Sequence, residues 1–332
     1  EERAGDPFIE VGNLPLSTAQ PWLVDRTIRL RQPTILFGDG GSGKSTLAAL
    51  IAGCVVTGME MGGFTPCYRG NVLYLDWETD ETDVDDTVKQ LIQGMGQEVI
   101  FKYRREVWPL SQTVRQARAF VESNNIAMVV IDSIGKACGG DIEKASDVLG
   151  FFQAVRSLNI ATLLVDHITK AGSGGKPIGS VFKHNEARVT FEVRKHQVPE
   201  KGRMHIAVHQ QKANKDDLIA PFGLEFVYGE GITIKRGAIP TEATTLVEQL
   251  PHWDRVLRVL KGASELLSLD DVTARVNDGV HKDKVIAKTS VNARLSDLVK
   301  DGRAVRIDYQ GIPNAVPKFG PRSDREDEAA HG

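Results

Sequence analysis

Residues 33–50 read PTILFGDGGSGKSTLAAL, and this stretch decides the fold. The apolar run 34–37 predicts a β-strand, residues 38–45 match the pattern G-x-x-x-x-G-K-S, and the run that begins at Thr46 predicts a helix. The glycines allow successive backbone N–H groups to converge on a phosphate, and the helix adds its free N–H groups and the positive end of its dipole. The stretch therefore predicts a loop that binds the phosphates of a nucleoside triphosphate.

Two positions of this loop have specific expected roles. Lys44 supplies a positive charge for the β- and γ-phosphates of ATP, and Ser45 supplies a hydroxyl ligand for Mg²⁺. A glycine-rich turn with a chance lysine is the alternative, but the flanking strand and helix argue against it. The residues expected to bind the nucleotide are Gly38, Asp39, Gly40, Gly41, Ser42, Gly43, Lys44, Ser45 and Thr46.

Predicted strands and helices alternate along the first half of the chain. Because the central strands are almost wholly apolar, they predict a mostly parallel sheet with helices on both faces, which is an α/β fold. Shorter runs between 187 and 235 predict antiparallel strands added to its edge. The strands are expected at 71–76, 99–103, 127–131 and 161–165, and the helices at 44–56, 80–95, 112–124 and 144–158.

The chain of 332 residues is long enough for more than one domain. After the α/β domain, three short helices and a β-hairpin predict a small winged helix-turn-helix domain, with its last strand at Ala315–Val316. The expected divisions are a flexible N-terminus at 1–14, the α/β domain at 15–236, a linker at 237–250, the winged-helix domain at 251–318 and a disordered tail at 319–332.

The composition excludes several classes of protein. The net charge of −3 gives no overall sign of a nucleic-acid partner, so a site for one must be local. Cys54, Cys67 and Cys138 show neither zinc spacing nor a disulfide framework, which indicates a reducing, cytoplasmic location. No apolar run approaches the length of a membrane span, so no membrane partner is expected.

Two acidic residues follow predicted strands. Asp132 ends the apolar run 129–131, where its carboxylate would hold Mg²⁺ through water, opposite Ser45. Glu78 follows the strand at 71–76, and the carboxyl ends of parallel strands converge on the ligand. Glu78 is therefore the candidate base that polarises the attacking water. Asp76 and Asp80 are the competing candidates, and Asp80 could instead cap the following helix.

His167 and the loop after it form a further candidate region. His167 closes the strand at 161–165, from where it could sense the γ-phosphate, although a purely structural histidine is the alternative. The loop 171–179 is rich in glycine, and lysines in and around it suit a phosphodiester backbone, unless it is simply a flexible surface loop. The lysines expected to contact DNA are Lys170, Lys176 and Lys183.

These motifs together resemble the RecA-like ATPases, in particular the plasmid and phage replicative helicases that are related to DnaB-type hexameric helicases. The resemblance covers about residues 15–235. It implies a RecA-like P-loop NTPase core in a ring or filament, with ATP between subunits and single-stranded DNA passing along central loops. The stretches that carry it are 22–24, 38–45, 75–78, 131–133, 166–167, 179–188 and 212–215.

The resemblance also assigns residues that would act on a neighbouring subunit. Arg188 is similar in position to the arginine finger of that branch, which neutralises charge on the γ-phosphate of the adjacent ATP. Lys212 is similar to a lysine of a later strand motif, and the sequence departs from the pattern at Asn214, where relatives carry an arginine or an aromatic–glycine pair. The alternative for Arg188 is an exposed strand residue or a pair with Glu192.

The predicted winged-helix domain has a different charge balance from the whole chain. Residues 251–318 contain 12 Lys and Arg against 9 Asp and Glu, a net charge of +3. Such side chains reach bases and phosphates, although winged helices also serve as protein-contact modules. The residues expected to contact DNA, duplex or forked, are Lys288, Ser290, Asn292, Arg294, Arg303 and Arg306.

The sequence thus predicts an ATP- and Mg²⁺-dependent DNA motor, a hexameric helicase that moves along single-stranded DNA. The catalytic residues expected are Lys44, Glu78, His167 and Arg188. Two other functions stay open at this point. One is a recombination ATPase that forms filaments on single strands, and the other is a regulatory ATPase that its C-terminal domain tethers to DNA.

Overall fold

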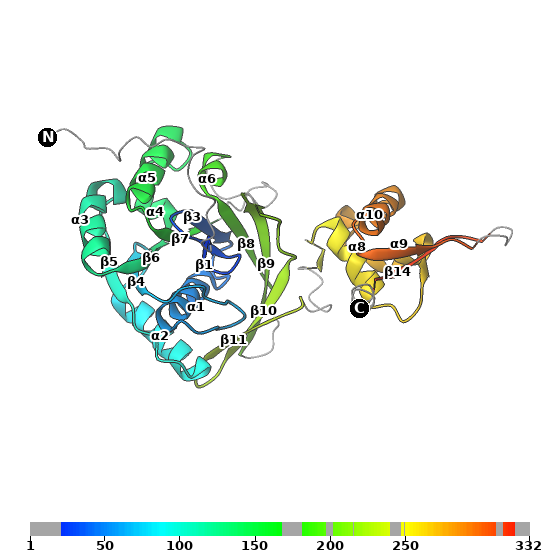
Figure 1. Ribbon diagram of the computed structural model, residues 1–332, viewed down its shortest axis with the longest axis horizontal. Helices are drawn as coiled ribbons and strands as arrows, with labels where there is room; N and C mark the ends of the chain where they lie inside the picture. The colour runs from blue at the N-terminus through cyan, green and yellow to red at the C-terminus, as the bar shows by residue number, and fades with distance from the viewer. Residues whose placement is uncertain are drawn as a thin grey trace, which may run out of the picture.

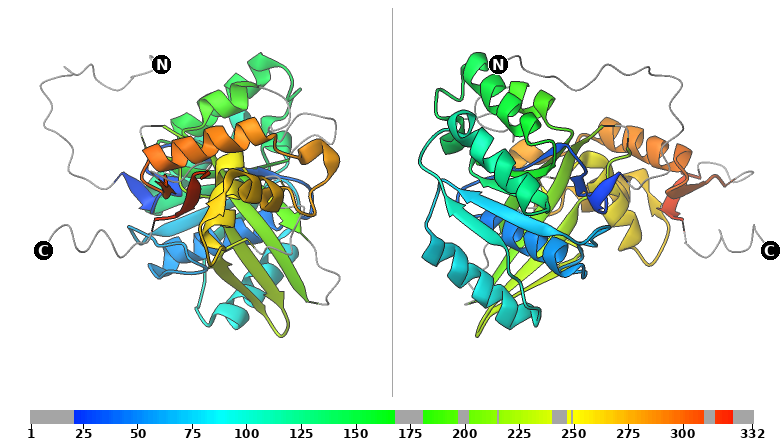
Figure 2. Two further views of the ribbon diagram at one scale, coloured as in Figure 1. Left: turned by 90° about the vertical axis from the view of Figure 1, so that its right-hand side faces the viewer. Right: turned by 60° about the vertical axis from the view of Figure 1, so that its left-hand side comes forward.

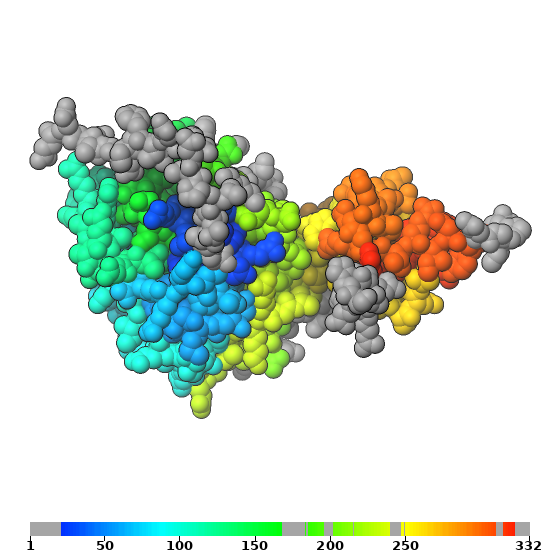
Figure 3. All heavy atoms as spheres, in the orientation of Figure 1, coloured from blue at the N-terminus to red at the C-terminus, as the bar shows by residue number. Residues whose placement is uncertain are grey.

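The computed structural model describes residues 21–167, 181–196, 202–214, 216–239, 247–248, 250–309 and 315–322. These residues form a large α/β part and a smaller C-terminal part (Figure 1). Figure 3 shows the smaller part projecting from one side of the larger one. The segments predicted as a flexible N-terminus at 1–14 and most of the tail and linker lie outside the described residues.

One nine-stranded sheet organises the large part, in the order β11-β10-β9-β8-β3-β7-β6-β4-β5. The strands from β5 to β8 in this order are parallel, and β8 to β11 pair antiparallel, which confirms the predicted mostly parallel sheet with antiparallel edge strands. The strands are β3 (Pro33–Gly38), β4 (Asn71–Asp76), β5 (Lys102–Arg105), β6 (Ile126–Asp132), β7 (Ala161–His167), β8 (Val189–His196), β9 (Arg203–Ala213), β10 (Phe222–Tyr228) and β11 (Ile232–Gly237).

Helices cover both faces of this sheet, as the right-hand view of Figure 2 shows. One face packs against α1 (Lys44–Thr57) and α2 (Glu81–Met95), together with the short ribbon β1 (Trp22–Val24) and β2 (Ile28–Arg29). The other face packs against α3 (Leu110–Ser123), α4 (Ile134–Cys138) and α5 (Ala145–Ser157). The helix α6 (Val181–Glu186) precedes β8.

Alternate residues of each central strand enter two separate hydrophobic cores. Leu36 of β3 lies in the core under α1, whereas its neighbours Ile35 and Phe37 lie in the core under α5. Strands that are buried on both faces are apolar at nearly every position, which explains the almost continuous apolar runs of the sequence.

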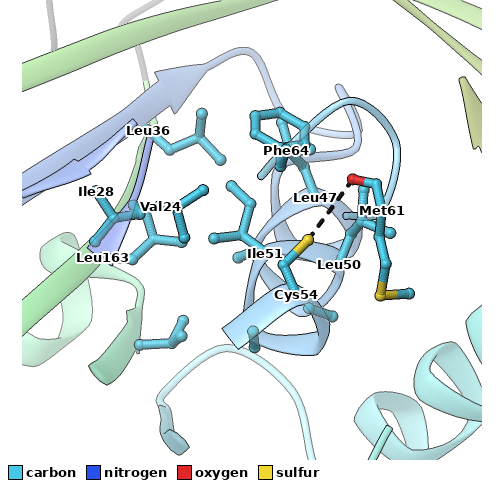
Figure 4. Packing of buried hydrophobic residues seen from close by; sticks show 14 of the residues in the cluster. Val24, Ile28, Leu36, Leu47, Leu50, Ile51, Cys54, Met61, Phe64 and Leu163 are labelled. Atoms are coloured by element: carbon cyan, nitrogen blue, oxygen red, sulfur yellow. Dashed lines mark hydrogen bonds between the residues drawn. The ribbon is translucent and has the colours of Figure 1, made fainter. Parts of the chain in front are cut away.

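Figure 4 shows the core under α1 from close by, with Ile51 facing Val24 and the thiol of Cys54 directed toward Met61. The Cys54 thiol donates to the carbonyl oxygen of Met61 at 3.6 Å, and burial raises its pKa to about 12. Cys54, Cys67 and Cys138 are all free thiols.

The C-terminal part has a core of its own, in which Val256, Leu260, Val291, Leu295 and Phe319 are buried. Its three α-helices and last two strands follow the predicted order, whereas a strand between the first two helices was not predicted, and the assignment as a winged helix-turn-helix stays a prediction. The elements are α8 (His252–Lys261), β12 (Leu267–Ser268), α9 (Leu269–Val276), a single 3₁₀ turn (Lys282–Lys284), α10 (Lys288–Lys300), β13 (Ala304–Ile307) and β14 (Lys318–Pro321).

The last strand corrects two predictions. It was expected at Ala315–Val316 with the domain ending at residue 318, but β14 spans Lys318–Pro321 and pairs with β12 and β13. Val316 is 59% exposed, whereas Phe319 is 5% exposed and fills the core between the helices. The larger aromatic side chain therefore determines which residues pair, and the folded domain extends beyond 318 into the segment predicted as a disordered tail.

The other observed boundaries of strands and helices differ from the predicted ones by small amounts. The exception is β5, at the edge of the sheet. A strand was predicted at 99–103, and β5 begins only at Lys102 because its pairing with β4 starts there, Leu73 opposite Lys102. The apolar residues before it do not continue the strand, since Val99 packs in the core under α1 and Ile100 is exposed.

None of the helices in the described part of the chain combines the length and the hydrophobicity that a membrane-spanning segment needs.

The revised position of the last strand predicts a difference between two substitutions. Phe319→Ala should destabilise the C-terminal part by about 3–5 kcal/mol, because it opens a cavity in that core. Val316→Ala, three residues away and exposed, should change the stability by less than about 0.5 kcal/mol. Hydrogen exchange of the amides of α10, measured on the full chain, reads the stability of this part alone. Equal effects of the two substitutions would contradict the placement of β14.

Candidate active site

The phosphate-binding loop lies between the carboxyl end of β3 and the start of α1, as predicted. Two of its glycines are required by their surroundings. A Cβ at Gly38 would lie 2.1 Å from the carbonyl oxygen of Val193 in the neighbouring strand. Gly43, at the start of α1, has a φ of +80°, a backbone angle that residues other than glycine rarely adopt. The loop therefore depends on glycine at these positions for its shape.

Lys44 is buried at the first turn of α1. Its Nζ donates to the carbonyl oxygens of Asp39 at 2.7 Å and of Gly38 at 3.1 Å. Burial lowers the pKa of Lys44, and the nearby carboxylates of Asp132 and Asp166 counteract this effect without reversing it. The ammonium group thus lies inside the loop, where a phosphate would compete with the two carbonyl oxygens for its protons.

Ser45 and Asp132 are brought together by α1 and β6. Asp132 is buried at the end of β6, where its carboxylate accepts hydrogen bonds from the hydroxyls of Ser45 and of Tyr74, the latter at 2.8 Å. Burial raises the pKa of Asp132, and these two hydrogen bonds oppose the rise. A hydroxyl and a carboxylate beside a phosphate loop form a donor set that suits Mg²⁺, which takes few protein oxygens and completes its shell with phosphates and water.

Within the described residues, no group of three or more His, Cys, Asp and Glu side chains could by itself hold a metal ion. Ser45 and Asp132 as ligands of Mg²⁺ remain a prediction.

Glu78 lies beyond the carboxyl end of β4 and faces three polar side chains. Its Oε1 accepts a hydrogen bond from Ser133, its Oε2 pairs with Lys136 at 3.0 Å, and His167 Nε2 lies 3.8 Å from Oε1. Burial raises the pKa of Glu78, but the hydrogen bonds from Ser133 and Lys136 outweigh it, so that the pKa lies below its ordinary value. The carboxylate is therefore ionised at neutral pH, as a proton acceptor must be.

The two competitors of Glu78 have structural roles. Asp76 is buried, and its carboxylate accepts from Glu78 N at 2.7 Å, from the backbone and hydroxyl of Thr79 and from Tyr103 at 3.1 Å. Asp80 caps α2 by accepting from the backbone of Thr82 and Asp83. Because Asp76 shapes the turn that carries Glu78 and Asp80 fixes the next helix, Glu78 stays the predicted base.

His167 ends β7 directly beside the phosphate loop, with Gly38 opposite it in the register of β3 and β7. Its ring is partly exposed and points toward Glu78. The strand therefore places this histidine between the loop and the candidate base, as a γ-phosphate sensor requires, and the role stays a prediction.

Residues 12–173 match the family model of an AAA domain, and they include the phosphate loop, Glu78, Asp132 and His167. This part of the chain is a P-loop ATPase domain. A comparison with curated proteins finds no match. The family match ends before Arg188 and Lys212, so it gives no information on these two residues.

Arg188 lies at the other end of the ATPase domain's sheet from the phosphate loop. Its backbone N–H donates to the carbonyl oxygen of Pro33, the first residue of β3, whereas the loop follows the last residue, Gly38. Five residue steps along a strand separate these ends by about 17 Å. The exposed Arg188 therefore cannot reach the phosphate loop of its own chain.

Two neighbours define the surroundings of Arg188. Lys212 lies at the same end of the sheet, opposite Thr190, and its Nζ donates to the carbonyl oxygen of Asn185 at 3.2 Å. Burial and the nearby Arg188 lower the pKa of Lys212. The alternative of an ion pair between Arg188 and Glu192 is wrong, because Glu192 is buried and pairs with Arg194 at 2.6 Å.

The prediction that Lys183 contacts DNA is wrong. Its side chain is fully buried, and its Nζ lies 2.9 Å and 3.2 Å from the two carboxylate oxygens of Asp166. The reason is that α6 packs against α5 within the ATPase domain, so its third residue faces inward. Lys170, Lys176 and the glycine-rich loop between them lie outside the described residues.

In the C-terminal part, most of the predicted DNA contacts already have partners. Lys288 pairs with Asp270, Arg294 pairs with Asp297 at 3.0 Å, and Arg303 lies 4.4 Å over the ring of Trp253. Arg306 pairs with Asp308 at 2.9 Å, and Asn292 is exposed. A surface hollow contains Ser290 and Arg294, and its lining residues are His252, Trp253, Thr289, Ser290, Ala293 and Arg294.

The sequence analysis missed three residues near the phosphate loop. Lys136 pairs with Glu78, and Tyr74 donates to Asp132. Lys195 lies above the loop, since a Cβ at Gly41 would come 3.5 Å from its Nζ. None of these contacts follows from a local motif, because each depends on how distant strands and helices are paired.

The burial of Lys183 leads to a prediction about stability. Lys183→Met should destabilise the ATPase domain by about 3–5 kcal/mol, because Asp166 is left as an unpaired buried charge. Lys288→Met, which breaks an exposed pair, should cost less than about 1 kcal/mol. Chemical denaturation of the full chain provides the measurement, and the double substitution Asp166→Leu/Lys183→Met should regain much of the loss. A surface role for Lys183 would instead give two equally mild single variants.

Proposed function

We propose that the chain is an ATP- and Mg²⁺-dependent DNA motor of the RecA-like type. In this proposal, copies of the chain, six being expected, form a ring that couples hydrolysis to movement along single-stranded DNA, and so unwinds duplexes. The observation that carries it is the position of Arg188 at the opposite end of the sheet from its own phosphate loop. An exposed arginine at that position suits a nucleotide held by a neighbouring copy.

Each residue of the site then has a part in hydrolysis. Bound Mg²⁺ would withdraw charge from the β- and γ-phosphates, with Ser45 and Asp132 as the protein groups that hold it. Lys44 moves from the carbonyl oxygens of the loop to the phosphates. Glu78 accepts a proton from the water that attacks the γ-phosphate, and Arg188 of the next copy neutralises the charge that develops there.

Glu78 can do this only after it exchanges partners. Ser133 and Lys136 occupy both of its oxygens, and Lys136 also stabilises the ionised form. A carboxylate held in this way is a weak base for the attacking water. Its release would therefore be a step at which a DNA partner could stimulate turnover.

A regulatory ATPase that is tethered to duplex DNA is the second candidate. The C-terminal part favours it, because this part has its own hydrophobic core and a hollow with Arg294, Ser290 and His252 at the surface. This candidate requires slow hydrolysis that single strands do not change. The motor requires the opposite.

The decisive experiment is the rate of ATP hydrolysis with and without single-stranded DNA. We expect stimulation by single strands, at least a hundredfold loss in Glu78→Gln with nucleotide binding retained, and loss of tight binding in Lys44→Ala. Glu81→Gln, an exposed position in the first turn of α2, is the matched control and should behave as the wild type. Hydrolysis that is indifferent to DNA would support the regulatory candidate, and an unchanged rate in Lys44→Ala would reject both.

Action of Arg188 on a neighbouring copy predicts complementation between inactive variants. Arg188→Ala and Lys44→Ala should each be inactive, but a mixture of the two should recover part of the rate, because some contacts then join an intact loop to an intact arginine. Arg203→Ala, on β9, provides an exposed arginine as a control that should stay active. The mixing ratio that gives the highest rate reports how the copies alternate, and no recovery at any ratio would contradict action between copies.

A further inference from the structure

A tyrosine that no motif singles out contacts the candidate Mg²⁺ ligand. Tyr74 lies in the middle of β4 and is buried, with its ring stacked on those of Phe101 and Tyr103 at centroid distances of 5.7 Å and 6.3 Å. Its hydroxyl donates to Oδ2 of Asp132 at 2.8 Å. A rigid ring that packs against two aromatic neighbours fixes the position of this donor.

The contact determines how the carboxylate of Asp132 can turn. One oxygen is held by Tyr74 from the interior of the sheet, while the hydroxyl of Ser45 donates to the same carboxylate from α1. When Ser45 directs its oxygen to Mg²⁺, Tyr74 is the side-chain donor that continues to hold Asp132. The oxygen that Tyr74 does not hold is then the one available to the metal and its water.

We propose that Tyr74 is a positioning residue for Mg²⁺: its hydrogen bond holds Asp132 in the orientation that serves the metal. This inference rests on the proposed function only in taking Ser45 and Asp132 as the groups that hold Mg²⁺. Groups that orient a metal ligand in this way change metal affinity without touching the metal.

Tyr103 offers a matched comparison within the same stack of rings. Its hydroxyl also donates to a buried carboxylate, Oδ2 of Asp76 at 3.1 Å, but Asp76 supports the turn at Glu78 rather than the metal. Removing either hydroxyl deletes one hydrogen bond to one carboxylate. The two variants should therefore differ in their response to Mg²⁺ if Tyr74 has the proposed role.

The test is a Mg²⁺ titration of ADP binding to the full chain, read by a fluorescent ADP analogue. In Tyr74→Phe, the affinity for ADP without Mg²⁺ should equal that of the wild type, and the Mg²⁺ concentration at half-maximal enhancement should rise about tenfold. Tyr103→Phe should keep the wild-type midpoint. In an Asp132→Asn background, Tyr74→Phe should have no additional effect, because the group it positions is already lost.

A second variant tests the inference where Tyr74→Phe is unstable. 4-Aminophenylalanine at position 74 keeps an N–H donor on a ring of the same shape, and it should restore the wild-type midpoint. A wild-type midpoint in Tyr74→Phe, an equal shift in Tyr103→Phe, or no restoration by the amino variant would overturn the inference. Failure of the proposed function is a separate result, since ADP binding by the wild type would then not respond to Mg²⁺ or would not occur.

Discussion

The parallel pairing of four adjacent strands determines where the functional side chains of the ATPase domain lie. Because β3, β7, β6 and β4 run in one direction, their carboxyl ends meet at one edge of the sheet. The phosphate loop follows β3, Glu78 lies beyond β4, and Asp132 and His167 are the last residues of β6 and β7. Residues that are separated by up to 130 positions in sequence thereby become neighbours, and the helices on both faces keep the sheet rigid enough to hold them.

Charges inside this domain are arranged with alternating sign. Lys183 neutralises Asp166, and the carboxylates of Asp166 and Asp132 both lie near Lys44. Each of these groups is almost completely removed from water, at a cost that only a partner of opposite charge offsets. The phosphate loop thus lies on a set of charges that depend on one another, and a nucleotide enters this set as a further negative partner of Lys44.

The sequence predicted the features that depend on a few consecutive residues. It was less informative about the features that depend on how distant strands and helices pack together. The glycine spacing at 38–43 and the apolar run before Asp132 are contained in a few residues, and both the loop and the strand were predicted. The burial of Lys183 depends on α6 turning back toward Asp166, 17 positions away, and the sequence suggested a surface lysine. Phe319 was missed because the last strand was predicted at Ala315–Val316 and residues 319–332 as a disordered tail, whereas the packing of an aromatic ring decided the strand.

The contacts of Glu78 with Ser133 and Lys136 affect when such a domain could hydrolyse its bound ATP. In the proposed mechanism, a carboxylate that already accepts from two donors is a weak base for water, so ATP hydrolysis would stay slow until these donors are displaced. The same carboxylate would then determine whether the domain hydrolyses ATP or remains inactive. Under the proposed function, bound ATP would be conserved until another group replaces Ser133 and Lys136 at this carboxylate.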